Sequence, residues 1–328
     1  MSTKPKTSSA AIPVTEANFR QAESDMYFAV GIKNAGGIGK LYHYRELMPI
    51  DHQTVIRANR DTLYSSGVFD LDVGPVTVTL PDPQGRFMSL IAIDEEQYAV
   101  ETVYAPGTFS YTKDKVGTRY FLLGVRTFVD PNDSSDIAKV HALQDAIKCE
   151  QPGGPGTFQV PNWDPVTQKA LRADLLKRAA AIPDTNNMYG PKGKVDPERH
   201  LIGTATGWGA NAPEDATYVP VIPAKNDGKT VHKLTLKGDV PVDGFWSISV
   251  YGDDGYFKPN VRNAYSINTV SAKRDADGSV TIQFGGCDGT TPNCIPITPG
   301  WNYWVRLYRP RKEILDGTWK FPAAQPVS

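Results

Sequence analysis

The sequence predicts a mainly β fold with some helices (α+β), and three observations carry that prediction. Apolar and polar residues alternate in short segments between 66 and 130 and again after about 218, as in strands with one buried face. The period changes to that of helices between 134 and 182. The 29 glycines, 26 prolines and Asp-Gly turns fit many connections between short strands. We therefore expect two antiparallel β-sandwich or jelly-roll-like domains with a helical segment between them.

The same patterns divide the chain into a disordered tail at 1–14, an N-terminal α+β domain at 15–133, a helical and loop connection at 134–217, and a C-terminal β-sandwich domain at 218–328. A helix is expected to begin at Thr15 as its N-cap and to end before the glycine-rich run at 35–39. Phe19, Ala22, Met26 and Val30 are spaced to form its apolar face.

The other elements follow from the same two periods. Strands are expected at 75–81, 86–94, 118–129, 231–236, 244–251, 279–284 and 302–308. Helices are expected at 136–148 and at 166–181, the second just after Asp164-Pro165. Residues 183–217 are expected to be loops. The glycine-rich run at 203–209 lacks the Gly-Lys-Ser/Thr ending of a phosphate loop, which argues against nucleotide binding.

Charge and composition exclude several function classes. The net charge is −1, from 35 Lys and Arg against 36 Asp and Glu, so we expect neither nucleic acid nor a membrane as a partner. The start of the chain is polar, without the apolar stretch of a signal peptide. A soluble cytoplasmic protein is expected, or a periplasmic one if a leader was removed. A homo-oligomer is expected as the commonest arrangement.

The odd count of three cysteines, Cys149, Cys287 and Cys294, argues against a disulfide scaffold. Cys287 and Cys294 flank a short turn; we favour two reduced thiols, and a small closed loop stays open as the alternative. No spacing typical of zinc ligands occurs.

The densest polar segment is Asn59-Arg-Asp-Thr-Leu-Tyr-Ser-Ser66, directly before an apolar run. A buried polar group without a partner costs about 1–3 kcal/mol, so these side chains must be solvated or joined in a network. Arg60 can bind a carboxylate in a fork, Asp61 can serve as a base, and Tyr64 and Ser65 can donate to a developing negative charge. Alternatively, Arg60 and Asp61 lock the loop to the sheet and Tyr64 fills the core.

This segment, together with 117–121, resembles the signature of the domain of unknown function family 1254. The segments 244–251, 277–279, 306–310 and 315–319, with Asn260, resemble the family 1214. The resemblance covers about 15–326 and implies β-sandwich domains with a helical segment between them. It implies no reaction. Relatives often carry Asn-Trp-Leu-Pro before the last strand, where this chain has Asn293-Cys-Ile-Pro296.

Other candidate groups surround this signature in sequence. His52 precedes it by seven residues and can reach the same site. Asp94, Glu95, Glu96 and Glu101 can form an acid/base pair, a calcium or magnesium site, or a solvated turn. No cofactor is predicted beyond that open alternative of a Ca or Mg ion. The aromatic residues of the C-terminal part, Trp246 and Tyr251 among them, either stack on sugars or form the core.

Three functions remain open. We favour a small-molecule enzyme, a hydrolase or lyase, with a polar pocket near the domain junction. Its catalytic candidates are Arg60, Asp61, Tyr64 and His52, and its substrate-binding candidates are Asn59, Ser65, Trp246, Tyr251 and Asn260. The alternatives are a carbohydrate-binding jelly-roll protein and a non-catalytic oligomeric scaffold. The expected ligand is a small molecule or a sugar.

Overall fold

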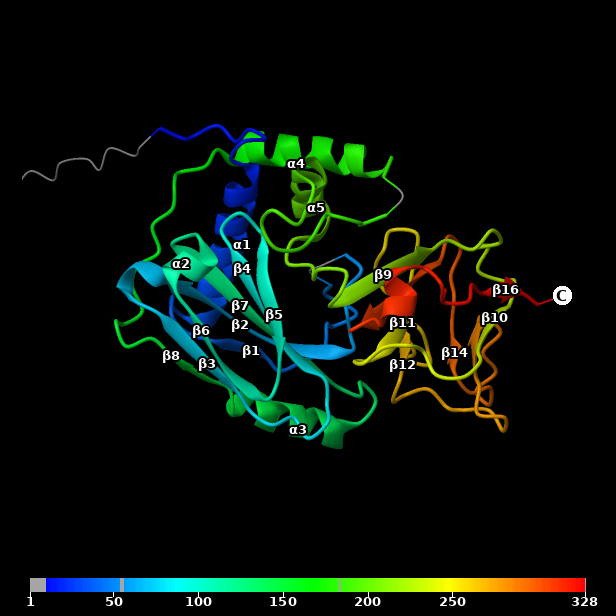
Figure 1. Ribbon diagram of the computed structural model, residues 1–328. Coiled ribbons are helices and arrows are strands. Elements are labelled where there is room, and N and C mark those ends of the chain that lie inside the picture. The colour runs from blue at the N-terminus through cyan, green and yellow to red at the C-terminus, as the bar shows by residue number, and fades with distance from the viewer. Residues whose placement is uncertain (1–9, 54–55, 183, 328) are drawn as a thin grey trace, which may run out of the picture.

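The computed structural model describes residues 10–53, 56–182 and 184–327. The strands fall into two groups, one from the N-terminal half of the chain and one from the C-terminal half (Figure 1). Residues 10–14, which we expected in a disordered tail, are held instead: the Ile12 amide donates to the Asn162 carbonyl at 2.7 Å, and Val14 is buried. The rest of that predicted tail lies outside the described residues.

The N-terminal half contains two antiparallel sheets. The larger has the order β1-β2-β7-β4-β5 and the smaller β6-β3-β8. Apolar side chains from both sheets, such as Val78, Leu90 and Leu123, form one core. The strands are β1 (Tyr42–Tyr44), β2 (Thr62–Asp70), β3 (Val76–Leu80), β4 (Met88–Asp94), β5 (Ala99–Tyr104), β6 (Gly107–Tyr111), β7 (Tyr120–Phe128) and β8 (Lys148–Glu150).

The C-terminal half contains two four-stranded sheets, ordered β12-β11-β15-β9 and β14-β13-β10-β16. Side chains from both sheets share a second core that includes Ile248, Ile282 and Val305. The pairs are antiparallel except β13 with β14. The strands are β9 (Ala216–Val221), β10 (His232–Leu236), β11 (Trp246–Tyr251), β12 (Ser266–Asn268), β13 (Val280–Phe284), β14 (Cys294–Ile295), β15 (Asn302–Tyr308) and β16 (Gln325–Pro326).

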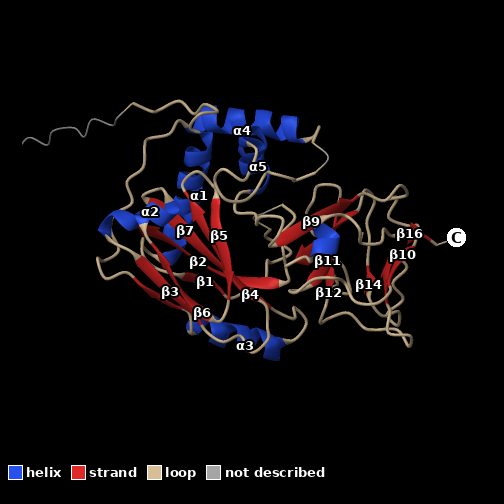
Figure 2. Ribbon diagram, viewed as in Figure 1, coloured by secondary structure: helices blue, strands red, loops and turns tan. Residues whose placement is uncertain are grey.

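Helices cover the N-terminal sheets from two sides, with α4 and α5 above and α3 below in Figure 2. The helices of the described chain as a whole are α1 (Phe19–Ala35), α2 (Lys113–Val116), α3 (Ser134–Asp145), α4 (Pro165–Ala179), α5 (Pro197–Gly207) and α6 (Lys312–Leu315), with a short 3-10 helix, η1 (Leu71–Val73). The predicted α+β class is confirmed: the chain is mostly β, with several antiparallel sheets. The finer sandwich or jelly-roll arrangement stays a prediction.

Two helix predictions need correction. The first helix is capped at Asn18 and not at Thr15, and Met26 and Val30 are exposed, at 36% and 53%. Its buried face is instead Phe19, Ala22 and Phe28, together with three polar residues, Glu23, Ser24 and Asp25. The polar residues can be buried because neighbouring elements supply partners, such as Arg172 for Glu23.

The second correction concerns 183–217, expected to be loops, which contain α5. Its N-cap, Asp196, accepts from the amides of Glu198 and Arg199, and Pro197 occupies the first turn. Glycines and threonines at 203–207 interrupt the apolar period of a helix, so the sequence pattern did not indicate one here. Helix α5 packs on α1 and α4.

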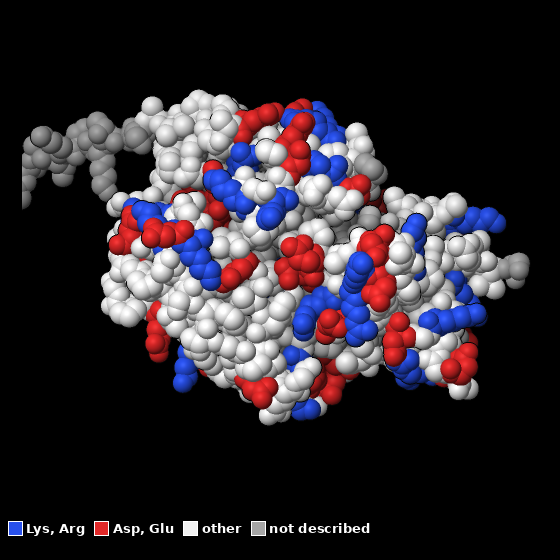
Figure 3. Space-filling model, viewed as in Figure 1, with Lys and Arg blue, Asp and Glu red and all other residues white. Residues whose placement is uncertain are grey.

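On the face shown in Figure 3, charges of both signs are interspersed. Within the described part of the chain, no helix is both long and apolar enough to cross a membrane.

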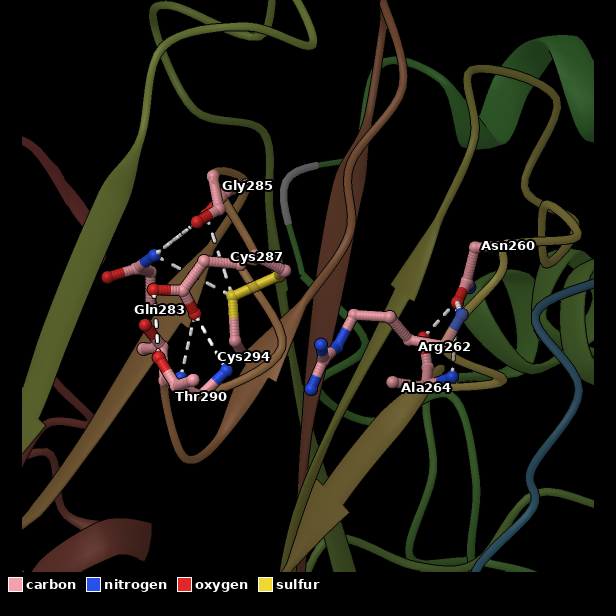
Figure 4. The surroundings of a disulfide bond; sticks show 11 residues. Asn260, Arg262, Ala264, Gln283, Gly285, Cys287, Thr290 and Cys294 are labelled. Carbon is pink, nitrogen blue, oxygen red and sulfur yellow. Dashed lines mark hydrogen bonds between the residues drawn. A yellow bond between two sulfur atoms is a disulfide. The ribbon is translucent and has the colours of Figure 1, made fainter.

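The favoured prediction of reduced thiols at Cys287 and Cys294 is wrong: the two sulfurs form a disulfide (Figure 4). Gln283 donates to the Gly285 carbonyl at 3.0 Å beside it and so holds the loop against β13. Sequence spacing alone could not decide this, because a bond also requires that the fold bring the two Cβ atoms together.

Reducing this disulfide is expected to lower the free energy of unfolding by about 2 kcal/mol, because the bond closes a short loop in the unfolded chain. Urea unfolding with and without dithiothreitol measures the change. Cys149→Ser is the matched control, since burial raises the pKa of that thiol to about 12 and it forms no disulfide. Three titratable thiols in the unreduced, unfolded protein would contradict the assignment.

Candidate functional site

The sheet β12-β11-β15-β9 has two unlike faces, and the candidate site lies on the more polar one. Trp246, Ile248 and Val305 point into the C-terminal core. Side chains alternate along a strand, so their sequence neighbours point the other way. These neighbours include Ser247, Ser249, Tyr251, Trp304, Arg306 and Tyr308. This second face meets segment 57–61 of the N-terminal half, as the hydrogen bonds between the two show.

A closed hydrogen-bond network surrounds Arg306, which is 3% exposed. Its guanidinium donates to Ser249 Oγ at 3.0 Å, to Tyr251 Oη at 2.8 Å and to the Arg57 carbonyl at 2.8 Å. Tyr251 donates in turn to the Ala58 carbonyl at 2.8 Å. The network ties the backbone before the signature to β11 and β15. Its side chains are buried, which leaves no room for a ligand among them.

Asp61 lies beside this network and is fully buried. Its Oδ1 accepts from Asn268 Nδ2 at 3.0 Å. Burial raises the pKa of Asp61, while Ser247, Arg306 and Asn268 act in the opposite direction. Among the described residues, neither Ser247 Oγ nor Asp61 Oδ2 forms a hydrogen bond of normal geometry. No direct ion pair joins Asp61 to Arg306 in the described structure, so the two charges compensate at longer range.

A second cluster begins on the five-stranded sheet. Tyr44, Tyr64, Arg126, Ser89 and Tyr104 are register neighbours on β1, β2, β7, β4 and β5. Residues directly opposite on adjacent strands point to the same face. The five side chains therefore form one polar row across the sheet.

Arg126 is the centre of that row. It donates to Asn211 Oδ1 at 3.2 Å and to the Gly209 carbonyl at 3.0 Å, and its guanidinium carbon lies 5.6 Å from the centre of the Tyr64 ring. It forms no ion pair with a carboxylate among the described residues, and part of its surface is exposed. A guanidinium held by neutral acceptors keeps its full charge for an anion.

Three tyrosines surround this guanidinium. Burial lowers the pKa of Arg126, but Tyr64, Tyr218 and Tyr308 more than offset it, so that the pKa is raised. Burial also raises the pKa of Tyr308 well above its ordinary value, which keeps the phenol neutral. Asn59 Nδ2 donates to Tyr308 Oη at 2.8 Å, which leaves the phenolic proton to point elsewhere. Tyr64 and Tyr218 are half-buried and can be reached by solvent.

A carboxylate completes the cluster. Asp215 Oδ1 accepts from Tyr104 Oη at 2.6 Å, and the Asp215 carbonyl accepts from the Arg309 amide at 2.9 Å. Burial raises the pKa of Asp215, and the hydrogen bond from Tyr104 opposes that rise. Arg309 is exposed and lies 4.5 Å from the centre of the Tyr104 ring. We name Arg126, Tyr64, Tyr218, Tyr308, Asn59, Asn211, Tyr104 and Asp215 the junction cluster.

The signature residues separate in space. Asn59 and Tyr64 join the junction cluster. Arg60 donates to the Met48 carbonyl and lies 5.5 Å from the centre of the Tyr265 ring, and burial lowers its pKa. Asp61 belongs to the buried network. Ser65 points to the opposite face from Tyr64, where its Oγ forms a 2.8 Å hydrogen bond with His43 Nδ1, and it is 1% exposed.

The remaining predicted residues also lie apart from the junction cluster. His52 is exposed on the loop before β2. Trp246 is buried in the C-terminal core, and Tyr251 belongs to the network of Arg306. Asn260 accepts from the amides of Arg262 and Ala264, so its side chain shapes a turn (Figure 4). Tyr251 and Asn260 both line a pocket of about 210 Å³, whose wall includes Ile295 and Pro296 of the divergent motif.

The acidic stretch does not form a solvated turn throughout. Asp94 and Glu95 are 3% and 8% exposed. Asp94 Oδ1 accepts from the amides of Glu96 and Tyr98 at 2.9 Å each, and Glu95 Oε2 accepts from the Tyr120 amide at 3.0 Å. No group of three or more His, Cys, Asp or Glu side chains that could hold a metal ion occurs in the part of the chain that is described.

Two family models match the chain. Residues 38–151 match the family described as "Protein of unknown function (DUF1254)", and residues 223–312 match "Protein of unknown function (DUF1214)". The chain belongs to the proteins that pair these two families. The closed network and the junction cluster therefore join the DUF1254 region, through Asp61 and Arg126, to the DUF1214 region, through Arg306 and Tyr308.

Two solved structures are similar to this chain in fold. The crystal structure of the VPA0106 protein from Vibrio parahaemolyticus has a TM-score of 0.73 at 17% identity, covering 95% of this chain and 98% of its own. An uncharacterised protein from Burkholderia cenocepacia has a TM-score of 0.50 at 11% identity, covering 90% of this chain and 84% of its own. The search of curated proteins finds no match.

Sequence reasoning missed Arg126, Tyr104, Asn211, Asp215, Tyr218 and Tyr308. One available signal was Arg126 itself, the charged residue within the mainly apolar strand at 120–128. The others come from separate segments, and only the pairing of β9 with β15 and the meeting of the two halves place them together.

Proposed function

We propose that this protein is a small-molecule enzyme that binds a carboxylic acid at the junction cluster, and that its reaction is of the lyase type. The observation that carries the proposal is the Arg126 guanidinium, which is partly exposed, has no carboxylate partner among the described residues and lies 5.6 Å from the centre of the Tyr64 ring. Arginine binds carboxylates through two parallel hydrogen bonds.

The cluster also contains groups suited to removing a proton next to that carboxylate. Asp215 would take the proton from the α-carbon, and its raised pKa brings its basicity closer to that of a working general base. The electron pair of the broken C–H bond would pass to the substrate carboxylate. Arg126 and the phenols of Tyr64 and Tyr218 would stabilise the added negative charge. This electron pair would then form the Cα–Cβ double bond, while the bond from the β-carbon to a leaving group breaks and the group departs with that bond's electrons, taking up a proton from solvent water.

A lyase fits this cluster better than a hydrolase. Of the two serines of the signature segment, Ser65 is buried on the other face of the sheet, so its hydroxyl cannot act as a nucleophile on a substrate bound at Arg126. The carbohydrate-binding jelly roll, the oligomeric scaffold and the homo-oligomer stay predictions. We also propose an oxidising compartment, because structural disulfides such as Cys287–Cys294 persist there.

The test is a panel of short-chain carboxylic acids, with binding measured by calorimetry and α-proton exchange followed by NMR in D₂O. Arg126→Met is expected to weaken binding of the best acid by about 30-fold or more. Asp215→Asn should retain binding and lose exchange. Arg311→Met, an exposed arginine paired with Asp243, is the matched control. Equal binding by wild type and Arg126→Met would overturn the proposal.

A further inference from the structure

A second pocket, of about 310 Å³, opens beside the junction cluster. It lies at the lower end of the range of about 300–1,000 Å³ that is usual for small-molecule sites. One wall is shared, because the rings of Trp304 in the pocket and Tyr218 in the cluster lie 6.3 Å apart. The pocket is lined by Arg57, Pro220, Val221, Ile222, Asn226, Asp253, Gly300, Asn302 and Trp304.

Arg57 supplies the positive charge of this pocket. Hydrogen bonds of both its amide and its carbonyl fix the Arg57 backbone. Its amide donates to the Gly255 carbonyl at 2.9 Å, and its carbonyl accepts from Arg306 at 2.8 Å. The residue adopts a φ of 52°, a conformation uncommon for a non-glycine residue.

The guanidinium of Arg57 stacks on Trp304, with its carbon 5.2 Å from the ring centre. It forms no ion pair with any described residue, and its Nε has no hydrogen-bond partner there. Stacking fixes the plane of a guanidinium and leaves the N–H edge for a carboxylate.

The other polar groups of the pocket are acceptors. Asn302 Nδ2 donates to the Gly252 carbonyl at 2.7 Å, and Asn226 Nδ2 donates to the Trp301 carbonyl at 3.4 Å. Each amide therefore leaves its oxygen for a ligand. Asp253 Oδ1 accepts from the Asp254 amide at 3.0 Å, which leaves Oδ2. Three oxygens match the three donors of an ammonium group.

Charge distinguishes between ligand classes. The pocket holds one cation, Arg57, and one anion, Asp253, so it complements a ligand with one charge of each sign. A sugar acid or a phosphate ester could pair with Arg57 but would leave Asp253 desolvated without a cation, and a neutral sugar would leave both charges desolvated without partners. Ile222, 76% exposed, and Val221 supply an apolar wall for a side chain.

We propose that this pocket binds a free α-amino acid, with its carboxylate on Arg57, its ammonium group on Asp253, Asn226 and Asn302, and an apolar side chain against Val221 and Ile222. This binding is separate from the reaction proposed for the junction cluster, although the two sites share a wall.

The test is calorimetric titration of the full chain with each of the standard L-amino acids. We expect an apolar amino acid such as L-leucine to bind. Measured in the Arg126→Met background, so that a carboxylic acid held by the junction cluster is not counted, its analogues 4-methylpentanoate, which lacks the ammonium group, and 3-methylbutylamine, which lacks the carboxylate, should each bind about 30-fold or more weakly than leucine. No binding by any amino acid, or equal binding by 4-methylpentanoate, would overturn the proposal.

Variants locate the binding. Arg57→Met and Asp253→Asn should each weaken leucine binding by about 30-fold or more, with circular dichroism and thermal unfolding as checks on the fold. Arg274→Met, a surface arginine paired with Asp239, is the matched control. Arg126→Met should leave leucine binding unchanged even if the junction cluster proves inactive. Loss of binding in Arg126→Met with retention in Arg57→Met would overturn the assignment to this pocket.

Discussion

Replacing Arg306 with methionine is expected to lower the free energy of unfolding by about 3–5 kcal/mol, the cost of breaking a buried charged network by removing one partner. The variant leaves the carbonyl oxygen of Arg57 without this donor, leaves the Ala58 carbonyl with Tyr251 alone, and removes a positive charge that compensates Asp61. Urea unfolding at neutral pH measures the loss. A change below about 1 kcal/mol would show that the network contributes little more than an ordinary surface contact.

A double-mutant cycle separates the charge from the hydrogen bonds. Asp61→Asn keeps an oxygen that can accept from Asn268, so it should cost less than Arg306→Met. The double variant should be more stable than the sum of the single effects by about 1–3 kcal/mol, because it removes both charges together. Lys312→Met, on α6 near the surface, is a control outside the network. Strictly additive losses would contradict the electrostatic coupling of Asp61 and Arg306.

Much of the fold could be predicted because most elements carry their own signal. The strand at 232–236 alternates between buried and exposed positions, and α4 begins at Asp164-Pro165, where a cap and a proline coincide. The same pair, Asp196-Pro197, begins α5. There the glycines and threonines that follow are poor helix formers, and packing on α1 and α4 stabilises the helix instead. Helix propensity therefore did not predict α5, because tertiary contacts stabilise it.

The site could be predicted only in part, for a related reason. The density of polar groups at 59–65 correctly marked a region with unusual contacts, but it did not show that Asp61 and Tyr64 face different surroundings. Tyr64 meets Arg126 through the register of β2 with β7, and Tyr308 joins them through the packing of the two halves. Neither contact can be predicted from the local sequence, since strand pairing depends on residues far apart in the chain.

The closed network and the open junction cluster depend on each other. Asn59 donates to Tyr308 in the cluster, while Arg57 and Ala58, just before it, accept from Arg306 in the network. The buried hydrogen bonds thus fix the backbone from which Asn59 projects. A rigid support of this kind is what a site needs to hold several donors at one point. Loss of Arg306 should therefore disturb ligand binding at Arg126 even under conditions where the variant stays folded.

A second large effect concerns pH. Asp25 on α1 is 2% exposed, and its Oδ2 accepts from Trp163 Nε1 at 2.8 Å, while Oδ1 has no partner among the described residues. Burial raises the pKa of Asp25 from 3.8 to about 7, and the nearby Glu95 acts in the same direction. The pKa of Asp94 is also raised to about 7, mainly by burial. These carboxyl groups favour the protonated state in the folded protein.

The sign of the pH effect follows from this preference. Between pH 4 and 7 the unfolded chain releases the Asp25 proton while the folded chain keeps it, so stability falls as pH rises. At about 1.4 kcal/mol per pKa unit, the gap between 3.8 and about 7 corresponds to about 4 kcal/mol at pH 8. Below pH 4 both states are protonated, and the cost disappears.

Asp25→Asn should therefore be more stable than the wild type at pH 8 and about equal to it at pH 4, because the amide oxygen can still accept from Trp163 and carries no charge. Urea unfolding at both pH values measures the difference. Asp174→Asn, exposed on α4, should change neither value. Since Asp94 remains, the variant should keep part of the pH dependence. Equal stabilities of Asp25→Asn and wild type at pH 8 would mean that Asp25 is solvated when ionised, and that α1 and the Trp163 loop separate enough to admit water.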